Sequence, residues 1–341
     1  MAVERGDTLL IVTEPPQRSF YDPRVAEVVA ERSRQLGVRT RVLEARLASG
    51  PDDVPTDGAR AMRSADHILF LSRLGDQIRF GDEHGSGCKT ISYTRDLDYL
   101  GSRFGCTPFH LFQDVHDRLL ERIRSAGRYS ITSASGTDLI GEVGDDVQRS
   151  VVTPFAITCF PAVICPPLRC VNLTGRLVLE RFLMSTSVND YESSVLFLDE
   201  PVSLEIDRSR IVGFHGPKAL ANTVREHYLR VGERFGGDPM TVNSWHAGIY
   251  PATFHAGHWR DDVASWAEIT FASPRYTHFH TCGVDPGNVA TATFDATIRF
   301  DGATLWDAGR PVFLERPEMQ ALLVEHRVSS VVFKLRSDIG L

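Results

Sequence analysis

Apolar residues in the first third of the chain form short continuous runs that alternate with segments of helical spacing. Residues 8–13 are a continuous apolar run, typical of a strand buried in a parallel sheet. Residues 23–36 carry apolar side chains at helical spacing, with Asp22 as the N-cap and a proline at the first helical position. A second apolar run at 39–43 follows a glycine that ends the helix. The order of these segments predicts a βαβ unit.

The same alternation continues to about residue 150. The pattern predicts strands at 65–71, 90–93 and 129–132 and an amphipathic helix at 115–126. Strands that alternate with helices favour an open, mostly parallel sheet covered by helices. The loop at 14–17 has no glycine-rich phosphate cradle, so we predict no dinucleotide site there. We assign residues 1–150 to an α/β domain.

From residue 151 the pattern changes to strands that follow one another with few helices between them. A helix is predicted at 216–231. The predicted strands are 176–179, 194–198, 203–206, 211–214, 277–282 and 290–300. Such an order is typical of an α+β domain with an antiparallel or mixed sheet, which we assign to residues 151–341.

Composition narrows the function. The chain has 341 residues, 42% of them hydrophobic, and a formal net charge of −7 with no stripe of basic residues, which argues against nucleic-acid binding. No apolar run is long enough to cross a membrane, and no secretory signal is evident. The six cysteines form no Cys-x-x-Cys pair, which favours reduced thiols. We therefore expect a cytoplasmic protein that acts on a small molecule, without a nucleic-acid or membrane partner.

The histidines are concentrated in one part of the second domain. Five of the twelve lie between residues 246 and 280: His246, His255, His258, His278 and His280. Histidine is the commonest metal ligand and a natural proton carrier near neutral pH, so this enrichment indicates a candidate site.

A predicted hairpin brings some of these side chains together. The Asp-Pro-Gly-Asn sequence at 285–288 is a strong turn signal between two strand-like runs. A turn centred on residues 286–287 would place His280 opposite Thr293 and His278 opposite Asp295, all on one face. Two imidazoles and a carboxylate are the ligands of mononuclear non-haem Fe(II) sites and of some Zn sites. A one-residue slip would turn Asp295 away, and the alternative interpretation is an ordinary solvated strand face.

Several short motifs resemble one metalloenzyme family. They occur in the expected order over most of the chain: Gln-Leu-Gly-Val at 35–38, Ser-Gly-Thr-Asp-Leu at 135–139, Phe-Pro at 160–161, Glu-Pro-Val at 200–202, Ile-Val-Gly-Phe-His-Gly at 211–216, His-Ala-Gly-Ile-Tyr-Pro at 246–251, Thr-Phe-Asp at 293–295, Phe-Asp-Gly at 300–302 and Trp-Asp-Ala-Gly at 306–309. The pattern is similar to the family that joins thermophilic-type leucyl aminopeptidases to 2,5-dihydroxypyridine 5,6-dioxygenase. Members of that family associate, so the resemblance implies a homo-oligomer.

The chain departs from the family at two ligand positions. The segment at 160–166 lacks the glutamate that the family places there, and the family's His-x-Asp has become Thr293-x-Asp295. A two-metal aminopeptidase site without those ligands is hard to defend. The resemblance therefore implies one divalent metal, with Fe(II) favoured and Zn the alternative.

We predict that Asp295 binds this metal with His246, His278 and His280, where His246 is carried over from the family's metal-binding loop. His255 and His258 are weaker candidates, as an acid or base beside the metal or as part of a polar loop.

Three functions follow. The leading hypothesis is a mononuclear Fe(II) dioxygenase-like enzyme for a small aromatic or amino-acid-derived molecule. The second is an aminopeptidase-like Zn hydrolase of a small amide or peptide. The third is a binding or scaffold protein that has lost the family's chemistry.

Overall fold

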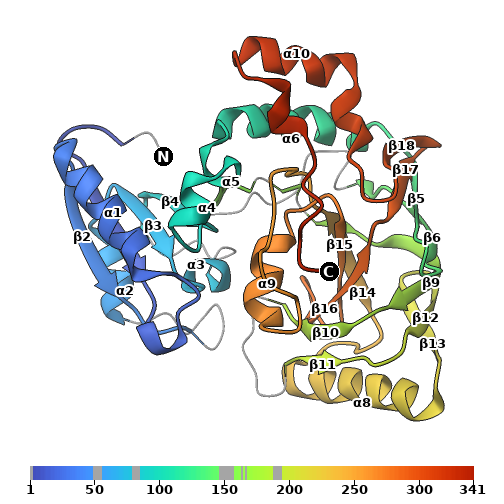
Figure 1. Ribbon diagram of the computed structural model, residues 1–341. Helices are drawn as coiled ribbons and strands as arrows, with labels where there is room; N and C mark the ends of the chain where they lie inside the picture. Colours follow the sequence, from blue (N-terminus) through green and yellow to red (C-terminus); the bar gives the residue numbers. More distant parts are fainter. Residues whose placement is uncertain are drawn as a thin grey trace. The chain divides into compact units, whose positions relative to one another are not determined.

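The computed structural model describes residues 3–48, 56–78, 85–145, 157–162, 164–165, 167–186 and 194–341. The chain divides into two compact units (Figure 1). The first contains residues 3–109 and 157–162 of the described chain, and the second contains most of the remainder.

The first unit is built on a parallel sheet with the strand order β2-β1-β3-β4-β7. Its strands are β1 (Thr8–Thr13), β2 (Arg39–Glu44), β3 (His67–Leu71), β4 (Cys88–Ser92) and β7 (Thr158–Phe160). Its helices are η1 (Pro16–Arg18), α1 (Pro23–Gln35), α2 (Thr56–Arg63), α3 (Leu74–Gln77), α4 (Leu97–Gly101) and α5 (Arg103–Cys106). The βαβ start is confirmed, and the Asp22 side chain caps α1 by accepting a hydrogen bond from the backbone N–H of Arg24.

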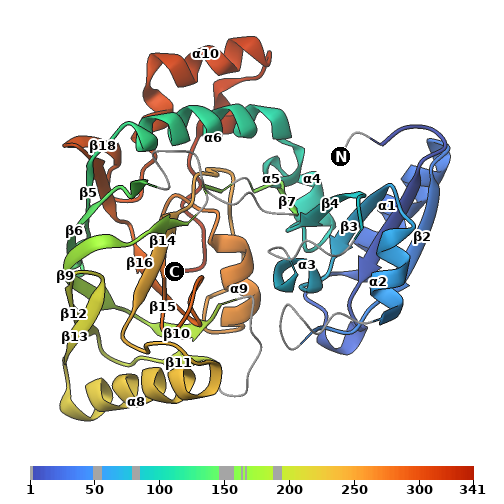
Figure 2. The ribbon, with the colours of Figure 1, turned by 180° about the vertical axis from the view of Figure 1, so that it is seen from behind.

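The second unit contains two antiparallel sheets (Figures 1 and 2). One has the order β11-β10-β16-β15-β14-β8. Its strands are β8 (Leu168–Arg169), β10 (Phe182–Ser185), β11 (Leu196–Phe197), β14 (Val242–Ala247), β15 (Tyr276–Thr281) and β16 (Val289–Phe294). The other has the order β13-β12-β9-β6-β5-β17-β18. Its strands are β5 (Arg128–Thr132), β6 (Asp138–Glu142), β9 (Val171–Leu179), β12 (Val202–Asp207), β13 (Arg210–His215), β17 (Thr297–Phe300) and β18 (Ala303–Trp306).

Helices cover parts of the second unit. They are α6 (Phe109–Arg124), α8 (Lys218–Phe235), α9 (Val263–Thr270), α10 (Pro317–Glu325), η2 (Val312–Glu315) and η3 (Ser330–Phe333). Figure 2 shows α8 beside β12 and β13, and α6 beside α10. The second pair is joined by Arg118, whose guanidinium donates to the backbone carbonyl of Glu318 at 2.6 Å. The expected combination of an α/β and an α+β region is confirmed.

The border between the regions differs from the expected one. The predicted boundary at residue 150 lies outside the described residues, but residues 110–145, which we had placed in the first domain, belong to the second unit. The reason is strand pairing, because β5 and β6 pair with β17 and β9 in an antiparallel sheet. The alternation of segments in the sequence gave no indication that β5 and β6 would join a different sheet from the strands before them.

The two sheets of the second unit pack against each other through aromatic side chains. Trp245 and Phe279 project from one sheet, and Tyr129 and Phe300 project from the other. All four are at most 3% exposed. Strand side chains alternate between faces, so the neighbours of Trp245 and Phe279 in sequence point to the opposite side of their sheet.

That opposite side carries a second aromatic cluster. Trp266 and Ala267 of α9 pack there against Tyr276, Ala292 and Phe294 of the sheet. Strands β15 and β16 therefore pack against aromatic side chains on both faces of the sheet. Within the described residues, no helix is long and apolar enough to cross a membrane.

Candidate metal centre

Two adjacent strands bring three histidines to one face of the sheet. In the antiparallel pair β14–β15, His246 lies directly opposite His278, and Ser244 lies directly opposite His280. Residues two apart share a face, and opposed residues on that face are neighbours. The pairing therefore places all three imidazoles and the serine hydroxyl on the face opposite Trp245 and Phe279.

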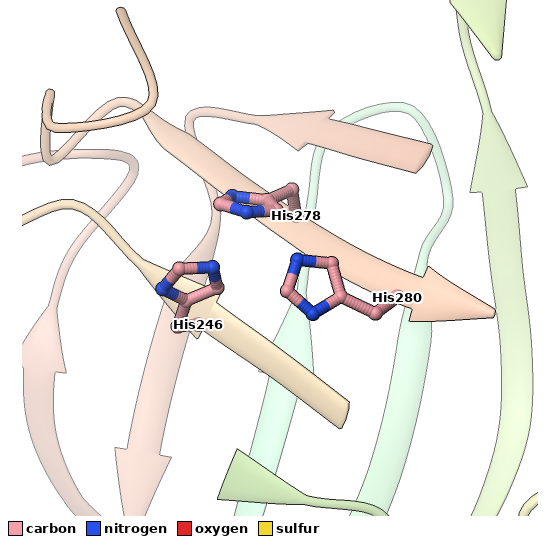
Figure 3. Close-up of side chains that lie close together, drawn as sticks. All are labelled: His246, His278 and His280. Atoms are coloured by element: carbon pink, nitrogen blue, oxygen red, sulfur yellow. The ribbon is translucent and has the colours of Figure 1, made fainter. Parts of the chain in front are cut away.

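The three rings are close enough to share one ion (Figure 3). The ring centroid of His246 lies 3.8 Å from that of His278 and 5.2 Å from that of His280, and the last two are 5.0 Å apart. One nitrogen from each ring lies within 4.8 Å of those of the other two. The rings are tilted by 54° to 65° to one another, so they converge rather than stack.

A hydrogen bond fixes the orientation of one ring. Ser244 Oγ lies 3.2 Å from His280 Nδ1, and both side chains are buried. The contact engages Nδ1, one of the two nitrogens of the imidazole. Metal-binding histidines commonly use their second nitrogen in this way.

The three histidine side chains are buried. His246, His278 and His280 are 4%, 9% and 5% exposed. The ring of Tyr276 lies 5.5 Å from that of His278, and burial raises the pKa of this tyrosine well above its usual range. The phenol therefore stays protonated and neutral at physiological pH.

Asp295, the predicted carboxylate ligand, is not part of the cluster. It follows the last residue of β16, has a left-handed backbone (φ 49°), and binds Arg275 through both carboxylate oxygens at 2.7 Å. Gly309 packs against it so closely that a Cβ there would lie 2.6 Å from Asp295 Oδ1. This carboxylate holds the two strands at the end of the hairpin.

The predicted hairpin register is wrong because the turn lies elsewhere. The backbone N–H of Gly287 donates to the carbonyl of Val284, so the turn is centred on 285–286. The N–H of Asn288 then donates to the carbonyls of both Thr281 and Cys282, which adds an irregular step. As a result His280 faces Ala290 and His278 faces Ala292.

The displaced residues have structural roles. Thr293 points to the other face, where its hydroxyl lies 3.5 Å from that of Thr137. The predicted strand at 290–300 is divided at Asp295 into β16 and β17, which belong to different sheets.

His255 and His258 lie in the loop before α9 and outside the three-histidine group. His255 Nδ1 is 2.9 Å from the carbonyl oxygen of Gly257, and the ring of the exposed His258 lies 5.6 Å from that of Trp259. The structure places neither residue in the cluster, which is the arrangement expected of a polar loop.

Sequence reasoning missed Ser244. Its signal was its position two residues before His246 on a strand, which implies the same face. Without the register of β14 against β15, that signal could not be connected to His280.

Fold and site together define a two-unit protein, α/β and α+β, with a buried histidine cluster on the central strands of an antiparallel sheet. No protein-family model and no curated protein matches the chain. Its structure is similar to that of 2,5-dihydroxypyridine dioxygenase from Pseudomonas putida KT2440, with a TM-score of 0.60 and 16% sequence identity over 93% of this chain and 94% of that one. This likeness shows a shared fold and gives no support to the leucyl aminopeptidase half of the sequence resemblance.

Proposed function

We propose that the protein is a mononuclear metal-dependent enzyme in which His246, His278 and His280 hold a divalent cation. We further propose that it is an Fe(II) dioxygenase acting on a small aromatic or amino-acid-derived molecule. The observation that carries the proposal is the convergence of three buried imidazoles on adjacent strands.

The donor set fits such an ion. Imidazole nitrogens bind metals at about 2.1 Å, so two ligands of one ion lie about 3.0 to 3.4 Å apart. Nitrogens already within 4.8 Å of one another reach that spacing by small side-chain rotations. Three protonated imidazoles so close together would repel one another, whereas a cation bound by the neutral rings is stabilised by all three.

His246, His278 and His280 would hold the divalent metal, and Fe(II) bound there would supply the redox chemistry that a dioxygenase needs. The protein's own part is to fix the ligands and exclude water. His246 and His278 are held by direct strand pairing, and His280 is oriented by Ser244. The aromatic cluster beside Tyr276 provides an apolar border to the site.

The choice of iron and oxygen chemistry rests on the fold shared with a dioxygenase. A specific observation keeps a zinc hydrolase as the second candidate, because three histidines without a carboxylate are also the ligands of a catalytic zinc site. A scaffold protein would retain the histidines without binding stoichiometric metal.

The test is metal loading followed by oxygen uptake. Untagged protein is purified without oxygen, loaded with Fe(II) or Zn(II), and supplied with a panel of hydroxylated aromatic acids and pyridines. The proposal predicts oxygen consumption by the iron form with at least one compound, lost in His246→Ala and retained in His258→Ala. Hydrolysis of amides by the zinc form alone would favour the hydrolase, and the absence of bound metal would overturn both.

A further inference from the structure

The sheet face that carries His246, His278 and His280 is called the three-histidine face below. The side chains that adjoin it differ greatly in size between its two sides. Strand pairing defines a row across the sheet, in which Ser244 lies opposite His280, His280 opposite Ala290, and Ala290 opposite Met184. Directly opposed residues share a face, so Ala290 and Met184 continue the surface that carries the histidines. The side chain next to His280 on this side is a single methyl group.

Solvent exposure distinguishes Ala290 from the other residues of β16. In β16, Val289, Thr291, Ala292 and Thr293 are at most 1% exposed, and Phe294 is 6% exposed. Ala290 is half-buried, as is Met184 on the neighbouring strand β10, which packs at the edge of the aromatic cluster. Space accessible to solvent therefore adjoins the histidine face at Ala290.

The other end of the face is closed. Ala292, opposite His278, packs with Phe182, Trp259 and Trp266 in the aromatic cluster. Trp266 is held there by a hydrogen bond from its indole N–H to the carbonyl of Ile339. A ligand could not enter at this end without displacing several buried rings.

We propose that small molecules reach the three-histidine centre across Ala290, and that the size of residue 290 determines which ligands can bind. The inference rests on the proposed function, because it assumes that the histidines hold a metal. The aromatic cluster that borders the histidine face favours a planar aromatic chelator as the class of ligand.

A larger residue at 290 would project toward the same space as His280. Opposed Cβ atoms lie about 5 Å apart, so the added carbons of leucine would lie beside the imidazole of His280, where a ligand would approach a bound metal. A planar chelator would then be excluded, whereas a linear anion of three atoms would still fit. The imidazoles themselves would not be altered, so metal binding should persist.

The experiment compares two probes on cobalt-loaded protein. Azide is the small probe and 4-nitrocatechol the planar chelator, and both are followed through the visible spectrum. In Ala290→Leu we expect 4-nitrocatechol to bind at least about tenfold more weakly, the equivalent of about 1.4 kcal/mol. Azide affinity and cobalt content should remain within about twofold of wild type. Ala290→Gly should bind both probes as wild type does.

A matched control is Ala303→Leu, which adds the same side chain to a half-buried position on β18 of the other sheet and should change neither affinity. Unchanged binding of 4-nitrocatechol to Ala290→Leu would overturn the inference while leaving the metal site intact. Loss of cobalt from Ala290→Leu would also overturn it, because residue 290 would then support the ligands rather than the opening. Failure of the wild type to bind cobalt would remove the proposed function itself.

Discussion

The two ends of the β15–β16 hairpin differ in how their polar groups are satisfied. At one end, Asp295 and Arg275 are oppositely charged and bind each other through two hydrogen bonds of 2.7 Å. In the middle of β15, His278 and His280 face a third imidazole from β14. The ion pair joins two opposite charges, whereas three buried imidazoles of the same kind are an arrangement that a bound cation would stabilise. The comparison separates an ion pair with a structural role from the histidine cluster that we propose holds a metal.

The largest effect should come from removing one histidine. We expect His278→Ala to lower the affinity for a divalent metal by more than about 100-fold, because loss of a direct ligand exceeds the 10- to 100-fold cost of losing a supporting group. Competition with a chromogenic chelator measures the affinity. An affinity that matched wild type would assign His278 to the protein core instead.

A substitution in the Asp295–Arg275 ion pair should lower the stability of the protein and leave its metal affinity unchanged. Asp295→Asn retains a residue suited to the left-handed backbone but removes the charge opposite Arg275. We expect the free energy of unfolding to fall by about 1 to 2 kcal/mol, since the pair is only partly buried, and metal affinity to stay the same. Urea unfolding measures the first quantity. A double-mutant cycle with Arg275→Gln should show that the two losses are not additive.

A smaller loss of metal affinity should come from Ser244, which supports a histidine of the cluster without being a proposed ligand. Ser244→Ala removes the hydrogen bond to His280 Nδ1 but no direct ligand. We expect about tenfold weaker metal binding, with unfolding of the metal-free protein changed by less than about 1 kcal/mol. Ser244→Thr, which restores a hydroxyl, should recover most of the affinity. If alanine and threonine behaved alike, the hydrogen bond would have no part in holding the ring.

The smallest expected effect is a loss of stability at low pH, caused by His227, a buried histidine outside the cluster. Burial, with a smaller contribution from Arg230, lowers the pKa of His227 on α8 to about 4. The unfolded chain binds this proton near pH 6.5, so the folded protein has its full stability above that pH and loses it as the pH falls toward 4. Between pH 7 and 5.5 we expect a loss of about 1 kcal/mol. Urea unfolding of wild type and His227→Gln should show a flatter pH dependence in the variant.

Prediction from the sequence was reliable where the residues of a segment determine its structure by themselves. The run at 8–13 and the Asp22-Pro23 start of α1 are set by the residues within them. His278 and His280 could be connected because strand alternation places residues two apart on one face, whereas His246 was joined to them only through the family resemblance.

Prediction failed where contacts distant in sequence decide the outcome. The turn at 285–286 is one residue earlier than the Asp-Pro-Gly-Asn signal suggested, and the irregular step at Asn288 changes the register further. Asp295 appeared to be a ligand because the partner it binds, Arg275, lies just before β15 and could not be identified without the register. The membership of β5 and β6 in the second sheet likewise depends on pairing with strands that occur much later in the chain.

The most direct test of the central claim is anomalous diffraction from crystals of the protein loaded anaerobically with Fe(II). The account predicts one strong peak in each chain, at about 2.1 Å from a ring nitrogen of His246, His278 and His280, with Asp295 still bound to Arg275. A peak at the Asp295 carboxylate, or none beside the three imidazoles, would contradict it.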